Sequence, residues 1–84
     1  MLFTLLIKRV AEKQLVRLPR KDQSRIWQAI KCLQNDPFVG KKLDGEMEGI
    51  FSLRVGTYRV LYEIHRKQIL VVVLTVGHRQ GIYK

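Results

Sequence analysis

Residues 50–65 read IFSLRVGTYRVLYEIH, and residues 69–76 read ILVVVLTV. Both stretches are rich in β-branched and aromatic residues, which favour strands. Short polar breaks at residues 56–57 and 66–68 divide them. The predicted strands are residues 50–55, 58–65 and 69–76. Because turns this short join antiparallel neighbours, the sequence predicts a three-stranded antiparallel meander.

Upstream of the meander, the sequence predicts one strand and two helices. Residues 2–7, LFTLLI, are apolar, contain no breaker and indicate a strand. Apolar side chains recur at helical spacing in residues 10–18 and 21–34, and Pro19 separates these segments. One face of each helix is apolar, made by Ala11, Leu15 and Leu18 in the first and by Ile26, Ile30 and Leu33 in the second. Two helices joined at a proline form an α-hairpin.

The predicted order is therefore β-α-α-β-β-β, with a loop at residues 38–49. This order is typical of a compact α+β fold, in which the α-hairpin packs on one face of the sheet and the other face stays open. An 84-residue chain forms one domain with a modest core. We expect Cys32, in an apolar helical stretch, to be a buried or half-buried core residue.

The chain is strongly basic, with sixteen Lys and Arg against seven Asp and Glu, a net charge of +9. Residues 1–42 hold ten basic and three acidic side chains, so most of the excess lies in the N-terminal half. Such a charge indicates a polyanionic partner. No apolar run approaches the roughly 20 residues that span a bilayer, so we expect a cytoplasmic protein with no membrane partner.

Motifs for metal and nucleotide chemistry are not found in the sequence. The single cysteine cannot form an intramolecular disulfide or half of a zinc site. We therefore expect no metal and no cofactor. If the protein cuts RNA, the 2′-hydroxyl attacks the adjacent phosphorus, and side chains orient it and stabilise the added negative charge.

The strand at residues 58–65 points alternate side chains to opposite faces of the sheet. Tyr58, Val60, Tyr62 and Ile64 share the face that looks like the core side. Arg59 lies on the other face, and burying an arginine in mid-strand is costly unless it is paired. Arg59 therefore lies on an open face or pairs with Glu63, and Arg54 on the preceding strand would extend a basic patch there.

The resemblance of this chain to a known family rests on two groups of residues. The segment at residues 53–62, LRVGTYRVLY, is followed by Val76-Gly77-His78-Arg79 and then by Tyr83. Together they closely resemble the RelE branch of the RelE/ParE toxin superfamily. Earlier landmarks agree, and they are Pro19, Asn35-Asp36-Pro37 and Lys42-Leu43-Asp44-Gly45. The resemblance covers essentially the whole chain, residues 1–84.

The resemblance implies a toxin of a type II toxin–antitoxin module, with a microbial-ribonuclease-like fold. Such toxins cleave mRNA in the ribosomal A site without metal and leave a 2′,3′-cyclic phosphate. Their partners are a cognate antitoxin, the mRNA and the ribosome, and operator DNA through the toxin–antitoxin complex.

By position, the resemblance assigns catalytic roles to Arg59, Arg79 and Tyr83. Arg59 would stabilise the transition-state phosphate, Arg79 would stabilise charge or protonate the leaving group, and Tyr83 would stack on the substrate. The side chains expected to bind RNA are Lys41, Lys42, Ser52, Arg54 and His78.

The sequence departs from the family pattern at the strand of residues 50–55. The pattern has lysines there, one of them a candidate general base, whereas this chain has Ile50 and Ser52. We therefore expect weak cleavage. His78 is one candidate for a substitute base, because histidine titrates near neutral pH, but the sequence does not identify the base. Two alternatives stay open: a ParE-like toxin that inhibits DNA gyrase, and a weakened toxin that acts through antitoxin binding and operon control.

Overall fold

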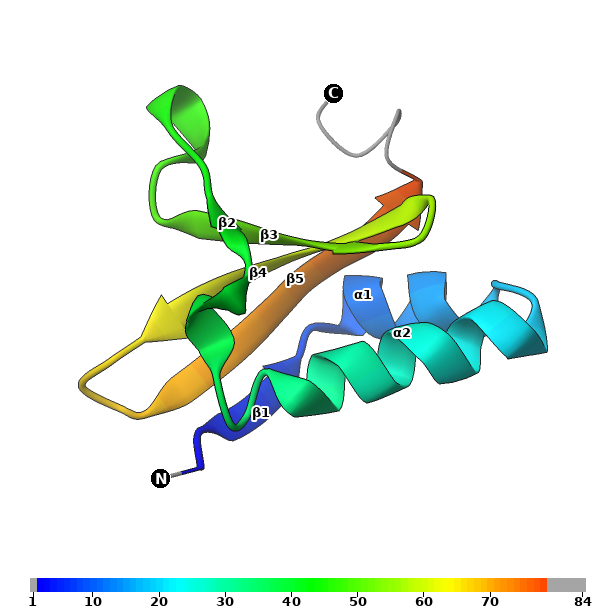
Figure 1. Cartoon of the computed structure of the whole chain (residues 1–84), viewed down its shortest axis with the longest axis horizontal. Helices are drawn as coiled ribbons and strands as arrows, with labels where there is room; N and C mark the ends of the chain where they lie inside the picture. The colour runs from blue at the N-terminus through cyan, green and yellow to red at the C-terminus, as the bar shows by residue number, and fades with distance from the viewer. Residues whose placement is uncertain (1, 79–84) are drawn as a thin grey trace.

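The computed structural model describes residues 2–78. Its elements are β1 (Thr4–Ile7), α1 (Arg9–Val16), α2 (Arg20–Cys32), the short 3-10 helix η1 (Pro37–Val39), β2 (Lys41–Lys42), the short 3-10 helix η2 (Gly45–Met47), β3 (Ile50–Val55), β4 (Tyr58–His65) and β5 (Leu70–His78). The strands form one sheet in the order β1-β5-β4-β3-β2, and both α-helices lie on the same face of it (Figure 1). The predicted α+β fold class and the α-hairpin on one face of the sheet are confirmed.

The predicted first strand lies at an edge of the sheet, beside the last one. β1 runs parallel to β5, with Thr4 opposite Leu70 and Ile7 opposite Val73. The other neighbouring strands pair antiparallel. A parallel pair needs a long crossover connection, and here the chain between β1 and β5 includes both helices.

The predicted loop at residues 38–49 contains structure that the sequence did not indicate. β2 pairs with β3, with Lys41 opposite Ser52 and Lys42 opposite Phe51. Two residues are too few to show the alternation that reveals a strand. Both α-helices also end two residues before the predicted ends, and Leu18 N donates to Leu15 O, a bond of the tighter 3-10 type. Neither helix in the described part of the chain has the length and apolar character needed to cross a membrane.

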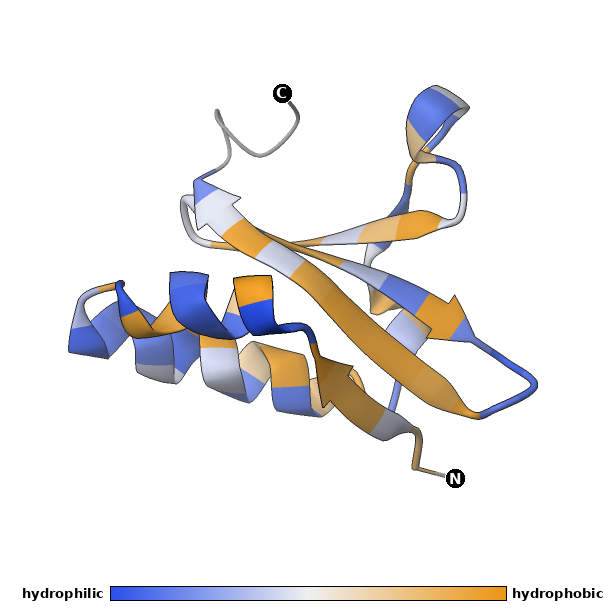
Figure 2. Ribbon diagram, turned by 180° about the vertical axis from the view of Figure 1, so that it is seen from behind, coloured by the Kyte–Doolittle hydropathy of each residue, from blue (hydrophilic) through white to orange (hydrophobic). Residues whose placement is uncertain are grey.

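The core lies between the α-hairpin and the sheet. Its buried side chains are Ala11, Ile26 and Ile30 from the helices, Leu33 directly after α2, and Val60, Tyr62, Val71, Val73 and Val76 from the strands. Leu15, Leu18, Tyr58 and Ile64 pack against them. Figure 2 shows the same division, with apolar residues concentrated along β5 and β1 and polar residues over much of the helices. The predicted apolar faces of both helices and of β4 are confirmed.

A β-bulge allows β5 to follow this core. Leu61 lies opposite Thr75, but its neighbour Tyr62 lies opposite Val73, so Leu74 is the extra residue. Strict alternation would place Val73 and Val76 on opposite faces of the sheet. The bulge turns both of them toward the helices, where each is buried.

Gln14 of α1 binds β5 beside this bulge. Its Oε1 accepts hydrogen bonds from Val76 N at 2.7 Å and from Thr75 Oγ1 at 2.9 Å. Gln14→Ala should lower the free energy of unfolding by about 1–3 kcal/mol, because it removes the acceptor for a part-buried backbone N–H. Urea unfolding measures the change. Gln14→Glu keeps an acceptor oxygen and should lose much less; equal losses in the two variants would argue against this role.

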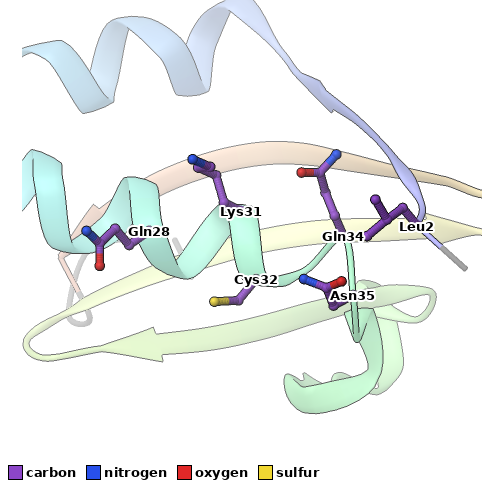
Figure 3. A pocket seen from close by; sticks show the side chains of 6 residues that line it. All are labelled: Leu2, Gln28, Lys31, Cys32, Gln34 and Asn35. Carbon is purple, nitrogen blue, oxygen red and sulfur yellow. The ribbon is translucent and has the colours of Figure 1, made fainter.

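Cys32 is exposed, so the prediction of a core residue was wrong. The side chain lines a surface hollow with Leu2, Gln28, Lys31, Gln34 and Asn35 (Figure 3). Cys32 lies four residues after Gln28, on the outer face of α2, whereas Ile30 and Leu33 turn inward. Cysteine is often buried, and the position of Cys32 beside the buried face of α2 led to the wrong prediction.

Candidate functional site

The sheet face away from the helices carries two arginines that lie directly opposite each other. Arg54 on β3 pairs in register with Arg59 on β4, and Arg59 in turn lies opposite Gly77 on β5. Arg54 is exposed and Arg59 is half-buried. Like charges in directly opposite positions destabilise a sheet, so an anion bound over this pair would relieve the repulsion. The predicted basic patch therefore has a geometry that suits a phosphate.

Ser52 fixes the Arg59 side chain on this face. Arg59 Nη1 donates a hydrogen bond to Ser52 Oγ at 3.2 Å, and Ser52 is only 2% exposed. β2 adds a further cation, because Lys41 pairs in register with Ser52 and is exposed. A guanidinium held at one nitrogen keeps its planar fork in a defined orientation, which is what bidentate phosphate binding requires.

Glu63, the alternative partner predicted for Arg59, contacts a histidine. Its Oε1 lies 3.0 Å from His65 Nε2, and the two side chains are 38% and 43% exposed. A contact between two side chains this exposed contributes little to stability. Glu63 lies opposite Ile50, at the far end of the β3–β4 pairing from Arg54 and Arg59.

The structure brings four of the predicted site residues together, namely Lys41, Ser52, Arg54 and Arg59. It does not bring Lys42 or His78 to them. Lys42 pairs with Phe51, and His78 pairs with Tyr58, both of which belong to the helix-facing side of the sheet. The candidate base His78 therefore lies on the other side of the sheet from Arg59. Arg79 and Tyr83 lie outside the described residues.

A polar cluster on the helix side was missed by the sequence analysis. Tyr58 Oη donates a hydrogen bond to Asp22 Oδ2 at 3.0 Å, and the His78 ring lies 4.6 Å from the Tyr58 ring. The bond to Asp22 raises the pKa of Tyr58 above its ordinary value, because the hydroxyl donates its proton to the carboxylate. An acidic residue in the first turn of a helix is favoured by the helix dipole, so Asp22 carried no signal of a second role.

Comparison with known proteins shows the family to which this chain belongs. Residues 5–83 match the family described as the ParE toxin of the type II toxin–antitoxin system parDE. Toxin RelG of Mycobacterium tuberculosis is 38% identical over 84 residues, with 98% of this chain and 97% of that protein covered.

Two solved toxin–antitoxin complexes contain a similar chain. The RelBE2 complex of M. tuberculosis matches with a TM-score of 0.87 and 36% identity, covering 94% of this chain and 93% of that one. The archaeal RelE–RelB complex of Pyrococcus horikoshii matches with a TM-score of 0.82 and 25% identity, covering 96% and 99%. The chain belongs to the RelE/ParE superfamily of type II toxins.

Proposed function

We propose that this toxin is a ribosome-dependent endoribonuclease that cuts mRNA in the A site. The observation that carries the proposal is the cross-strand pair of Arg54 and Arg59, with Arg59 held by Ser52 on the sheet face away from the helices. Two opposed guanidinium groups favour the binding of a phosphodiester. The reaction needs no metal, because the nucleophile is the 2′-hydroxyl of the RNA itself.

Each side chain of the proposed site has a distinct role. Arg59 stabilises the extra negative charge on the phosphorus centre as the 2′-hydroxyl attacks, and Arg79 stabilises charge or protonates the leaving 5′-oxygen. Tyr83 stacks on a base and orients the RNA. Lys41 and Arg54 bind the flanking phosphates. Proton removal from the 2′-hydroxyl has no strong base among the residues gathered at Arg59, which makes slow cleavage the expectation.

The proposed protein partner is a cognate antitoxin. Relatives at 36% and 25% identity have been solved as RelBE and RelE–RelB toxin–antitoxin complexes, which supports such a partner here. A net charge of +9 suits an antitoxin segment of opposite charge and steers association. The association rate should therefore fall as salt is raised. In this proposal the complex, rather than the toxin alone, binds operator DNA.

A second candidate is inhibition of DNA gyrase by binding. The match of residues 5–83 to a ParE toxin family favours it. It requires no arginine-centred phosphate site, so the arrangement of Arg54, Arg59 and Ser52 favours the ribonuclease.

One experiment separates the two candidates. Purified toxin is incubated with ribosomes whose A site holds either an all-ribose codon or the same codon with a 2′-deoxy sugar at the cut position. The ribonuclease proposal predicts a product ending in a 2′,3′-cyclic phosphate from the first RNA and none from the second. Inhibition of gyrase supercoiling without RNA cleavage would replace it with the gyrase proposal. Neither activity, with antitoxin binding retained, would indicate a weakened toxin.

A further inference from the structure

Two residues that each precede a site arginine in the chain meet on the helix side of the sheet. Tyr58 precedes Arg59, and His78 precedes Arg79. Tyr58 on β4 lies opposite His78 on β5. The centroids of their rings are 4.6 Å apart, and the ring planes form an angle of 35°. Successive strand residues point to opposite faces of the sheet, so Tyr58 points to the helix side and Arg59 to the other side. A contact that fixes Tyr58 therefore also fixes the backbone that carries Arg59.

The Tyr58 ring is also tied to α2. Its hydroxyl donates to Asp22 Oδ2 at 3.0 Å, across 36 positions of sequence. Asp22 lies in the first turn of α2, and Ile26 and Ile30 further along that helix are fully buried. The tyrosine is therefore bonded to a helix that the core itself holds in place, and not to a loop.

The turn between β3 and β4 lies against the same helix. Gly56 in that turn has a φ of +61°, and a Cβ built there would lie 3.3 Å from Arg25 Nη2. Arg25 lies one turn of α2 after Asp22. The start of α2 thus contacts the sheet at both the turn and the first residue of β4.

We propose that Asp22, Tyr58 and His78 are positioning residues. They form a clamp on the helix side of the sheet, opposite to the face that carries Arg59. The clamp fixes the backbone of Arg59 relative to β5, so that the Arg59 guanidinium is held in place for the reacting phosphate. The inference rests on the proposed ribonuclease function. Misplacing a reacting group by about 1 Å can cost roughly 100-fold in rate. The hydrogen bond from Tyr58 to Asp22 therefore controls the rate of catalysis, although neither side chain touches the RNA.

The test compares Tyr58→Phe with Gln23→Ala in single-turnover cleavage of ribosome-bound mRNA. Gln23 neighbours Asp22, and its Nε2 donates to Val16 O at 3.1 Å and Leu18 O at 2.8 Å, at the end of α1 and in the connection to α2. Both variants lose side-chain hydrogen bonds at the start of α2, so both should show a small fall in Tm. Tyr58→Phe should lower the maximal rate about tenfold while the half-saturating toxin concentration stays unchanged. Gln23→Ala should keep the wild-type rate.

Two variants of Asp22 extend the test. Asp22→Asn keeps an acceptor oxygen for the tyrosine hydroxyl and should retain most of the rate, whereas Asp22→Ala should match Tyr58→Phe. The double variant Asp22→Ala/Tyr58→Phe should be no slower than either single variant, because one bond is lost in all three.

Failure of the clamp and failure of the proposed function give different results. Cleavage by the wild type with equal rates for Tyr58→Phe and Gln23→Ala would overturn the clamp alone. A loss confined to the half-saturating concentration would also overturn it, because that result would place Tyr58 in binding. No cleavage by the wild type would overturn the proposed function and the clamp with it.

Discussion

Arg59→Ala should reduce ribosome-dependent mRNA cleavage by about 10²–10³-fold. That is the usual cost of removing one preorganised donor from a developing anionic centre. Arg59 is half-buried in the middle of β4, and Ser52 Oγ accepts a hydrogen bond from its Nη1 at 3.2 Å. Single-turnover primer-extension kinetics on programmed ribosomes measure the loss.

Two further variants show whether the loss comes from the guanidinium itself. Arg59→Lys keeps the charge but not the planar fork, and should recover only a small part of the rate. Arg54→Ala, at the exposed partner position, should weaken RNA binding more than it lowers the maximal rate. Antitoxin binding should survive Arg59→Ala. A variant that stays folded, binds antitoxin and cleaves at the wild-type rate would contradict the role given to Arg59.

Gly40→Ala should lower the free energy of unfolding by about 2–4 kcal/mol, the largest stability effect that we expect from a single added methyl group. Gly40 has an ordinary φ of −74°, so backbone strain does not contribute. An added Cβ would overlap the hydroxyl oxygen of Tyr62, which is fully buried. That hydroxyl donates to Pro37 O at 2.6 Å and accepts from Gly40 N at 3.1 Å, and the overlap would disrupt both bonds.

A double-mutant cycle identifies the cause of this loss. Tyr62→Phe removes the overlapping oxygen, so adding Gly40→Ala to it should cost much less than adding Gly40→Ala to the wild type. Urea unfolding of the four proteins gives the coupling free energy. Additive losses would mean that the Tyr62 hydroxyl is not what excludes a side chain at Gly40.

The strand and helix faces could be predicted from sequence because each is periodic over a long segment. Val60, Tyr62, Ile26 and Ile30 follow strict strand or helix spacing, and all four are buried. The bulge at Leu74 and the two-residue strand β2 could not be predicted in this way. Both depend on which strands become neighbours, and that contact is not encoded in the periodicity of either segment.

The site was predictable in part for the same reason. Alternation along β4 placed Arg59 on the face opposite to the core. The short turn before Tyr58 made Arg54 the cross-strand neighbour of Arg59. The position of His78 was not predictable, because the bulge in β5 changes which face its later residues occupy. The bond from Tyr58 to Asp22 spans 36 positions and leaves no local pattern.

The most direct test of the account is primer extension on mRNA incubated with purified toxin, with programmed ribosomes and, in parallel, without ribosomes in EDTA. The proposed ribonuclease should leave cuts confined to the A-site codon, present with ribosomes and lost in Arg59→Ala. No cuts on ribosome-bound mRNA by a folded, antitoxin-binding toxin would contradict it.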